Sequence, residues 1–188
     1  MTGFVITQLS LCDFRGFSGE KSWTFGQLTK ITGHNYQGKY SIADAIAFAP
    51  TGAPYFGGRD LDRLHNSGAA MMWVEAVLRT DEGKMHTVHR IRQNGRTVLS
   101  VDGATTTQER FAERFGSKDL ILSLLNPLYF AEVLGGDGRK LIEQYLAPIS
   151  HETVLSKLSE TMSELLKDEA TSVPATYVKS RREELKDI

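Results

Sequence analysis

Two glycines and a lysine at a fixed spacing give the segment GHNYQGKYS (33–41) the composition of a phosphate-binding loop. The pattern is a glycine, four residues and then Gly-Lys, which Gly33, Gly38 and Lys39 satisfy. Such a loop points successive backbone N–H groups at phosphates, and the helix that follows adds the partial positive charge of its N-terminus. We therefore expect Lys39 to contact the β- and γ-phosphates of a nucleotide and to serve in catalysis.

Two tyrosines in this segment depart from the pattern. Tyr40 stands where a serine or threonine hydroxyl would bind Mg²⁺, and a phenol is too long to place its oxygen there. Ser41 follows, but consecutive residues of a helix point about 100° apart. Tyr36 stands at a turn position that favours glycine. Three interpretations stay open: nucleotide binding with weakened metal handling, a loop that no longer binds nucleotide, and a chance match.

The loop needs neighbouring elements to hold it. The run LTKIT (28–32) predicts a short strand before the loop, and the run 39–49 predicts a helix after it, ended by Pro50 and Gly52. Upstream, alternation of apolar and polar residues predicts two strands joined by a turn, over 3–14, 15–17 and 20–25.

Downstream, turn signals separate three strand patterns, which predicts an antiparallel meander over 71–79, 85–93 and 96–101. The dipeptide Asn94-Gly95 between the last two is typical of a tight hairpin. The short run 128–133 predicts one more strand. Helical patterns follow the meander at 107–115, 118–125, 139–146 and 154–166, and the charged tail 176–188 predicts a helix that needs a partner.

Composition narrows the class of protein. The chain has 188 residues and a formal net charge of −1, so any contact with DNA must use a local basic patch. The single cysteine excludes an internal disulfide, and the sequence shows neither a signal peptide nor a membrane-spanning run, which favours the cytoplasm. Candidate DNA contacts, with solvated and paired side chains as the alternative, are Arg59, Arg63, His65, Arg79, Arg90, Arg92 and Arg96.

Taken together, these motifs resemble the N-terminal half of the head domain of the SMC/RecF/SbcC class of ABC-type ATPases. The resemblance rests on ITQLSLCDFRGF (6–17), on LTKITG followed by G-x-N-x-x-G-K with Asn35, and on SIADAIAFAPTG (41–52). Family members carry glycine at position 36 and serine or threonine at position 40, so this chain departs from the family at both tyrosines. Among the members, the SbcC-like proteins are favoured.

The resemblance implies an α/β fold of the P-loop NTPase type. The N-terminal lobe of an ABC-type ATPase head, with an antiparallel β-meander, would occupy residues 1–150, and helices that begin a coiled coil would occupy 151–188. ATP is the implied cofactor; Mg²⁺ handling is in doubt because of Tyr40, and no metal ligand is assigned. The implied nucleotide contacts are Arg15, Gly33, His34, Asn35, Tyr36, Gln37, Gly38, Lys39, Tyr40 and Ser41, with Arg15 approaching from the side and Ser41 near the α-phosphate.

In the family the catalytic site is composite, because the signature motif, the Walker B Asp-Glu pair and the switch histidine lie in the C-terminal half. None of these patterns occurs in the sequence. The family's Q-loop glutamine would fall within 126–134, where Asn126 and Glu132 are the candidate substitutes. The expected molecule is therefore a fragment or split half that does not hydrolyse ATP efficiently alone.

The resemblance also implies a role in DNA repair or recombination. The implied partners are the C-terminal half of the same head, a second head joined through ATP, an SbcD-type nuclease and double-stranded DNA, with no membrane. The alternative is a non-catalytic scaffold or interaction module that keeps the fold and has lost Mg-ATP binding. A stand-alone P-loop kinase is disfavoured, because the sequence shows no pattern of lid arginines or acceptor-site carboxylates.

Overall fold

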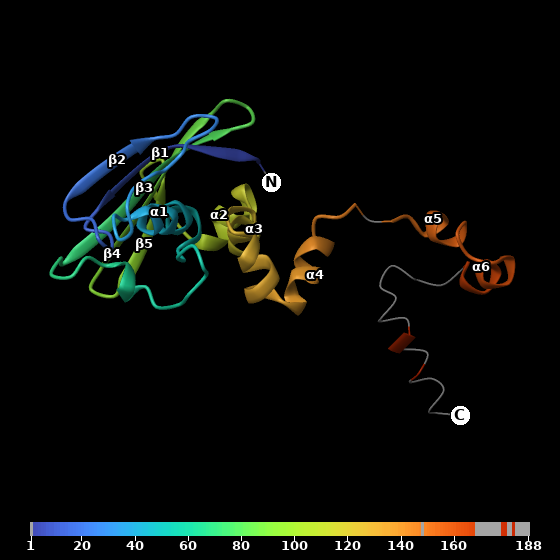
Figure 1. Cartoon of the computed structure of the whole chain (residues 1–188). Coiled ribbons are helices and arrows are strands. Elements are labelled where there is room, and N and C mark those ends of the chain that lie inside the picture. Colours follow the sequence, from blue (N-terminus) through green and yellow to red (C-terminus); the bar gives the residue numbers. More distant parts are fainter. Residues whose placement is uncertain (1, 148, 168–177, 180–181, 183–188) are drawn as a thin grey trace. The chain divides into compact units, whose positions relative to one another are not determined.

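A computed structural model describes residues 2–147, 149–167, 178–179 and 182 of the chain. The chain divides into two compact units, Met1–Glu143 and Gln144–Ile188. The first unit holds the sheet and the helices that pack on it (Figure 1). Among the described residues, no helix has the length and apolar character that crossing a membrane requires.

The centre of the first unit is a six-stranded antiparallel sheet with the order β2-β1-β3-β4-β5-β6. The predicted meander is confirmed and is longer by one strand, because β6 pairs with β5. The fold is therefore mixed α/β with an antiparallel sheet. The strands are β1 Phe4–Cys12, β2 Glu20–Thr24, β3 Met71–Thr80, β4 Met85–Gln93, β5 Arg96–Val101 and β6 Ala104–Thr106.

A register shift in β1 keeps its large apolar side chains on one face. The pairing with β3 skips a residue between Ile6 and Gln8, so that Ile6 lies opposite Leu78 and Leu9 lies opposite Ala76. Because side chains alternate along a strand, positions 6 and 9 share a face only if an extra residue is inserted between them. The bulge therefore places Leu9, which is fully buried, in the core.

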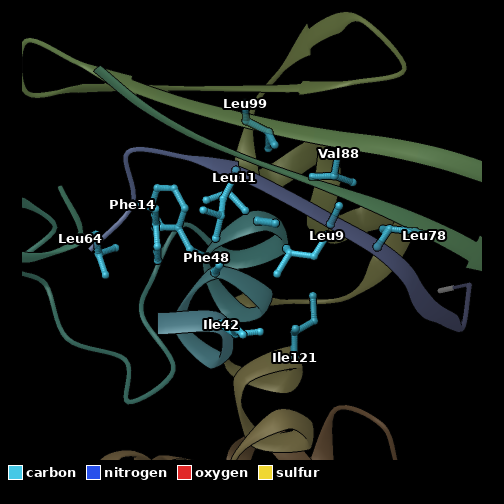
Figure 2. Close-up of a cluster of buried hydrophobic side chains, with 14 of the residues drawn as sticks. Leu9, Leu11, Phe14, Ile42, Phe48, Leu64, Leu78, Val88, Leu99 and Ile121 are labelled. Carbon is cyan, nitrogen blue, oxygen red and sulfur yellow. The ribbon is translucent and has the colours of Figure 1, made fainter. Parts of the chain in front are cut away.

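Helix α1, Lys39–Thr51, lies against this apolar face of the sheet. Most of its residues from Ser41 onward are buried, because it contacts β1, β3 and β4 as well as helix α3, Lys118–Leu125. Figure 2 shows side chains from the strands and from α1 meeting in this core. Pro50 occupies the last turn of α1 rather than ending it, and Gly52 caps the helix in the left-handed region with φ 70°.

The other helical elements are short. The predicted helices over 107–115 and 118–125 are confirmed, with Thr107 and Ser117 as N-caps. The predicted strand over 128–133 is wrong, because Tyr129–Leu134 forms a π-helix. The predicted helix over 154–166 is divided in two within the second unit. The remaining elements are α2 Gln108–Phe115, α4 Gly136–Glu143, α5 His151–Leu155, α6 Glu160–Leu166 and the 3₁₀ turn Asp62–Leu64.

The predicted strand over 28–32 is also wrong. This segment lies between β2 and the loop, with a bend at Leu28, and no described strand pairs with it. Leu28 is 94% exposed and Ile31 is 41% exposed. A strand requires a neighbour to take up its N–H and C=O groups, and this segment adjoins none of the six described strands in the sheet. The strand predicted before the phosphate loop is thus not formed within the described residues.

Within 151–188, where helices that begin a coiled coil are predicted, residues 168–177, 180–181 and 183–188 lie outside the described residues, and the coiled coil stays a prediction.

Candidate functional site

The predicted phosphate loop opens directly into the N-terminus of α1. Gly38 is the N-cap residue, with φ 84° and ψ 11°, and no side chain caps the helix. The amide N–H groups of Lys39, Tyr40 and Ser41 have no acceptor within the helix, because an α-helix leaves its first N–H groups free. This end of α1 therefore presents backbone donors and the positive end of the helix dipole to an anion.

Gly38 is required at its position for two reasons. Its φ of 84° lies in the left-handed region, which side chains other than hydrogen adopt only with strain. A Cβ atom at this position would also lie 2.6 Å from the ring of Phe17. The phosphate loop and the turn after β1 thus approach each other more closely than any other residue type would allow.

Inside the loop, two side chains bind the loop's own backbone. The Lys39 ammonium donates to the carbonyl oxygens of Gly33 at 2.7 Å and His34 at 2.8 Å. The Gln37 amide oxygen accepts the N–H of His34 at 3.1 Å. The loop is therefore held by its own side chains. The N–H of His34, which could otherwise donate to a phosphate oxygen, is bound by the Gln37 side chain.

A cavity of about 730 Å³ lies between this loop and the turn after β1. It brings together all of the predicted nucleotide contacts except Gly33 and His34. It also includes Gly16 and Phe17, which the sequence-based assignment missed. The Arg-x-Phe turn was visible as a motif, but the approach of Phe17 to Gly38 depends on tertiary packing, in which Phe17 also contacts the ring of Trp23 at 5.3 Å.

Arg15 lines the cavity and is also held by a carboxylate of helix α1. Its guanidinium pairs with Asp44 of α1, whose side chain is 4% exposed and also accepts the N–H of Tyr55 at 2.8 Å. The turn that carries Arg15 is fixed by its own N–H, which donates to Leu64 at 2.7 Å. Arg15 is thus at the side of the predicted site, as expected, with part of its charge committed to a buried carboxylate.

The two tyrosines lie on the open side of the loop. Tyr36 has φ 66° and is fully exposed, so it holds without a contact the backbone conformation that glycine adopts freely. Tyr40 is 69% exposed, whereas Ser41 is 8% exposed, although both line the cavity. Because consecutive residues of a helix point about 100° apart, the Ser41 hydroxyl is not equivalent to a hydroxyl at position 40.

The residues at the cavity do not fit a Mg²⁺ ion. Among the described residues that line it, none is an aspartate or glutamate. The nearest buried carboxylate, Asp44, is paired with Arg15. No group of three or more His, Cys, Asp or Glu side chains suited to a metal occurs in the described part of the chain. Mg²⁺ is bound in proteins through carboxylate or hydroxyl oxygens together with phosphates. The described lining holds the hydroxyl residues Tyr40 and Ser41 but no carboxylate.

Neither candidate substitute for the Q-loop glutamine lines the cavity. Asn126 is 2% exposed, and both ends of its amide serve the local fold: it donates to Tyr55 at 3.3 Å and accepts from Leu128 at 3.1 Å. Glu132 lies exposed in the π-helix. Asn126 is therefore a structural residue at the end of α3.

The predicted basic patch does not form one surface. Arg90 is 5% exposed and lies in the core, where burial lowers the pKa of its guanidinium to about 10. Arg92 pairs with Asp62 at 2.7 Å, and Arg63 pairs with Asp60 at 2.9 Å. The alternative of paired side chains describes Arg63 and Arg92, and Arg90 is a buried residue that a DNA contact surface cannot use.

Comparison with known proteins points in one direction. No protein-family model matches the chain. A DNA replication and repair protein RecF from Acaryochloris marina (strain MBIC 11017) is 28% identical over 104 residues, which are 55% of this chain and 28% of that protein. Solved structures of the recombination mediator protein RecF, described as RecF-ATP and RecF-ATPrS, have similar folds.

The likeness to RecF-ATP has a TM-score of 0.55 at 18% sequence identity and covers 99% of this chain and 55% of that one. The likeness to RecF-ATPrS has a TM-score of 0.52 at 19% identity and covers 57% of this chain and 29% of that one. The chain thus spans at most about half the length of these relatives. The preference for SbcC-like proteins finds no support in these comparisons. The chain has a distant similarity to the DNA replication and repair protein RecF, and its fold is similar to part of the solved structures of the recombination mediator protein RecF.

Proposed function

We propose that this chain is the nucleotide-binding N-terminal half of a RecF-like ATPase head that acts in DNA repair or recombination. One observation carries the proposal: the Gly-Lys pair of the phosphate loop opens into the N-terminus of α1 beside a cavity. The distant similarity to RecF supports the same function, since the solved RecF structures are described with ATP and ATPrS.

The geometry supplies the groups that a phosphate chain requires. The first amides of α1 are free of intrahelical acceptors, and Lys39 and Arg15 bring positive charge to the same cavity. Binding requires the loop to exchange internal contacts for external ones, because the Lys39 ammonium now binds Gly33 and His34. The cavity of about 730 Å³ lies in the usual size range of ligand sites.

We propose that the C-terminal half of the head completes this site. The segment 28–32 supports this, because its apolar side chains are exposed and no described strand takes up its backbone groups. The RecF-ATP structure has almost half of its length beyond the part that this chain covers. A second head joined through ATP, double-stranded DNA and an SbcD-type nuclease stay predictions.

Binding of ATP to the wild-type chain and to Lys39→Ala tests the proposal, with isothermal titration calorimetry as the measurement. We expect Lys39→Ala to weaken binding about tenfold or more, because the lysine contributes a charge-assisted contact. Lys84→Ala is the matched control, since Lys84 is an exposed lysine in the turn between β3 and β4, paired with Glu82. Equal and immeasurably weak ATP binding by the wild-type chain and by Lys39→Ala would refute nucleotide binding. ATP hydrolysis by the wild-type chain alone, faster than by Lys39→Ala, would refute the proposal that the site is incomplete without the C-terminal half.

A second candidate function is a non-catalytic scaffold or interaction module. The self-contacts of Lys39 and Gln37 within the loop favour it, together with the exposed Tyr36 and Tyr40. If it holds, the double substitution Tyr36→Gly and Tyr40→Ser creates Mg²⁺-dependent ATP binding that the parent lacks. Tight binding of Mg-ATP by the parent chain would exclude this function.

A further inference from the structure

We propose that the cavity at the phosphate loop binds the triphosphate of a nucleotide as a metal-free anion, without Mg²⁺. This inference rests on the proposed function and goes beyond it, because the fold family implies a Mg²⁺ ion that the residues of this chain do not fit. The basis is the chemistry of the oxygen atoms around the cavity and the balance of charge on its wall.

The carboxylate oxygens that could hold a metal are already committed. Asp44 is the carboxylate of α1, and its two oxygens accept from Tyr55 and pair with Arg15. Ser41 lines the cavity but is 8% exposed, and it stands one residue beyond the position that would bind the metal. Mg²⁺ demands near-octahedral oxygen geometry and gives up water reluctantly, so a site without a free carboxylate and with a phenol at position 40 offers it little.

Tyr40 changes what position 40 can do. The side chain is 69% exposed and lines the cavity, so its hydroxyl is open to a ligand. A neutral phenol carries one O–H donor, which suits a phosphate oxygen, whereas a metal would use its lone pairs. The Tyr40 phenol therefore donates to an oxygen of the phosphate chain. In a loop with serine or threonine at this position, the hydroxyl and the phosphate chain would instead share a metal.

The charge on the cavity wall favours the free anion. Lys39 and Arg15 are the charged side chains among the described lining residues, and both are cationic. The exposed ends of the first amides in α1 add partial positive charge. A Mg²⁺ ion bound to the phosphates would cancel part of the charge that these groups attract, and it would find no carboxylate ligand in exchange. Mg²⁺ is therefore expected to leave binding unchanged or to weaken it.

The experiment is a calorimetric titration of the full 188-residue chain with ATP in EDTA and again in excess Mg²⁺. We expect the wild-type affinity in EDTA to equal or exceed that in Mg²⁺. A gain of more than about threefold on adding Mg²⁺ overturns the inference while it leaves the proposed function standing. Absence of ATP binding in both buffers overturns the inference and the proposed function together.

Two variants at the same exposed position sharpen the test. Tyr40→Phe keeps the ring and removes the donor, so we expect ATP affinity in EDTA to fall about fivefold. Tyr40→Ser restores a short hydroxyl, so we expect binding to become at least about fivefold tighter with Mg²⁺ than with EDTA. Unchanged affinity of Tyr40→Phe would overturn the role of the phenol.

Titration with inorganic tripolyphosphate in EDTA tests whether the phosphates are the group recognised, and we expect an affinity within about tenfold of that for ATP. Binding of ATP without binding of tripolyphosphate would overturn this assignment.

Discussion

The two ends of helix α1 differ in whether side chains bind their terminal backbone groups. At the N-terminus no side chain caps the helix, and the residues around the loop are exposed. At the C-terminus carbonyl groups are taken up by the buried Arg90 and the half-buried Gln108. Arg90 donates to Ala49 at 3.1 Å and Gln108 donates to Pro50 at 3.0 Å. The difference teaches that one end of the helix is committed to the fold, whereas the first N–H groups at the other end have no acceptor within the helix.

The C-terminal end of α1 (the closed end) is held by further contacts of Arg90 and Thr51. The Arg90 guanidinium lies 5.6 Å from the centre of the Phe48 ring and donates to the Gln108 side chain at 2.8 Å. Thr51 adds a hydrogen bond to the carbonyl of Ala47 at 2.6 Å. Arg90 also donates to the carbonyl of Pro50 at 3.5 Å. Because a buried arginine without a carboxylate partner is costly, its four contacts with two carbonyls, an amide oxygen and a ring explain why it is tolerated.

The largest effect is expected at the closed end. Arg90→Ala removes the donor to three acceptors and leaves a space in the core, so the free energy of unfolding should fall by about 3 kcal/mol in urea denaturation. Arg96→Ala, at an exposed arginine of β5, is the control and should change it by less than about 0.5 kcal/mol. ATP affinity of folded Arg90→Ala should stay within about twofold of wild type. A loss of affinity as large as in Lys39→Ala would show that the two ends are not independent.

An intermediate effect on stability is expected where the N-terminal end of α1 (the open end) meets the turn after β1. Gly38→Ala introduces strain at φ 84° and a contact with Phe17, so the free energy of unfolding should fall by about 2 kcal/mol and ATP binding should weaken. Gly83→Ala is a matched control, because Gly83 has φ 79° and nothing within 4 Å of the added carbon. The control should lose about 1 kcal/mol. Equal losses in the two variants would show that the Phe17 contact has no weight.

The smallest effect is expected inside the loop. Gln37→Ala frees the N–H of His34 for a phosphate oxygen, so ATP affinity should rise about threefold in a calorimetric titration. Stability in urea should not change, because Gln37 is exposed. Gln93→Ala, at the exposed end of β4, should leave ATP affinity unchanged. A fall in affinity of Gln37→Ala would mean that the side chain contacts the ligand instead of competing with it.

Much of the first unit could be predicted from the sequence, because its signals are local. The meander followed from alternation and from Asn94-Gly95, and the helices over 107–115 and 118–125 followed from period and caps. The runs 28–32 and 128–133 failed for a shared reason. Both have strand-like composition, but a strand exists only where a neighbour accepts its hydrogen bonds, which composition does not encode.

The candidate site divides in the same way. The sequence by itself determined the glycine spacing, the lysine and the start of α1, because these depend on backbone conformation and on residues adjacent in the chain. Only the tertiary structure decided that Phe17 covers Gly38 and that Asp44 is bound by Arg15 and Tyr55. Those contacts join segments that are distant in sequence, and their geometry is set by how the turn after β1 packs on the helix.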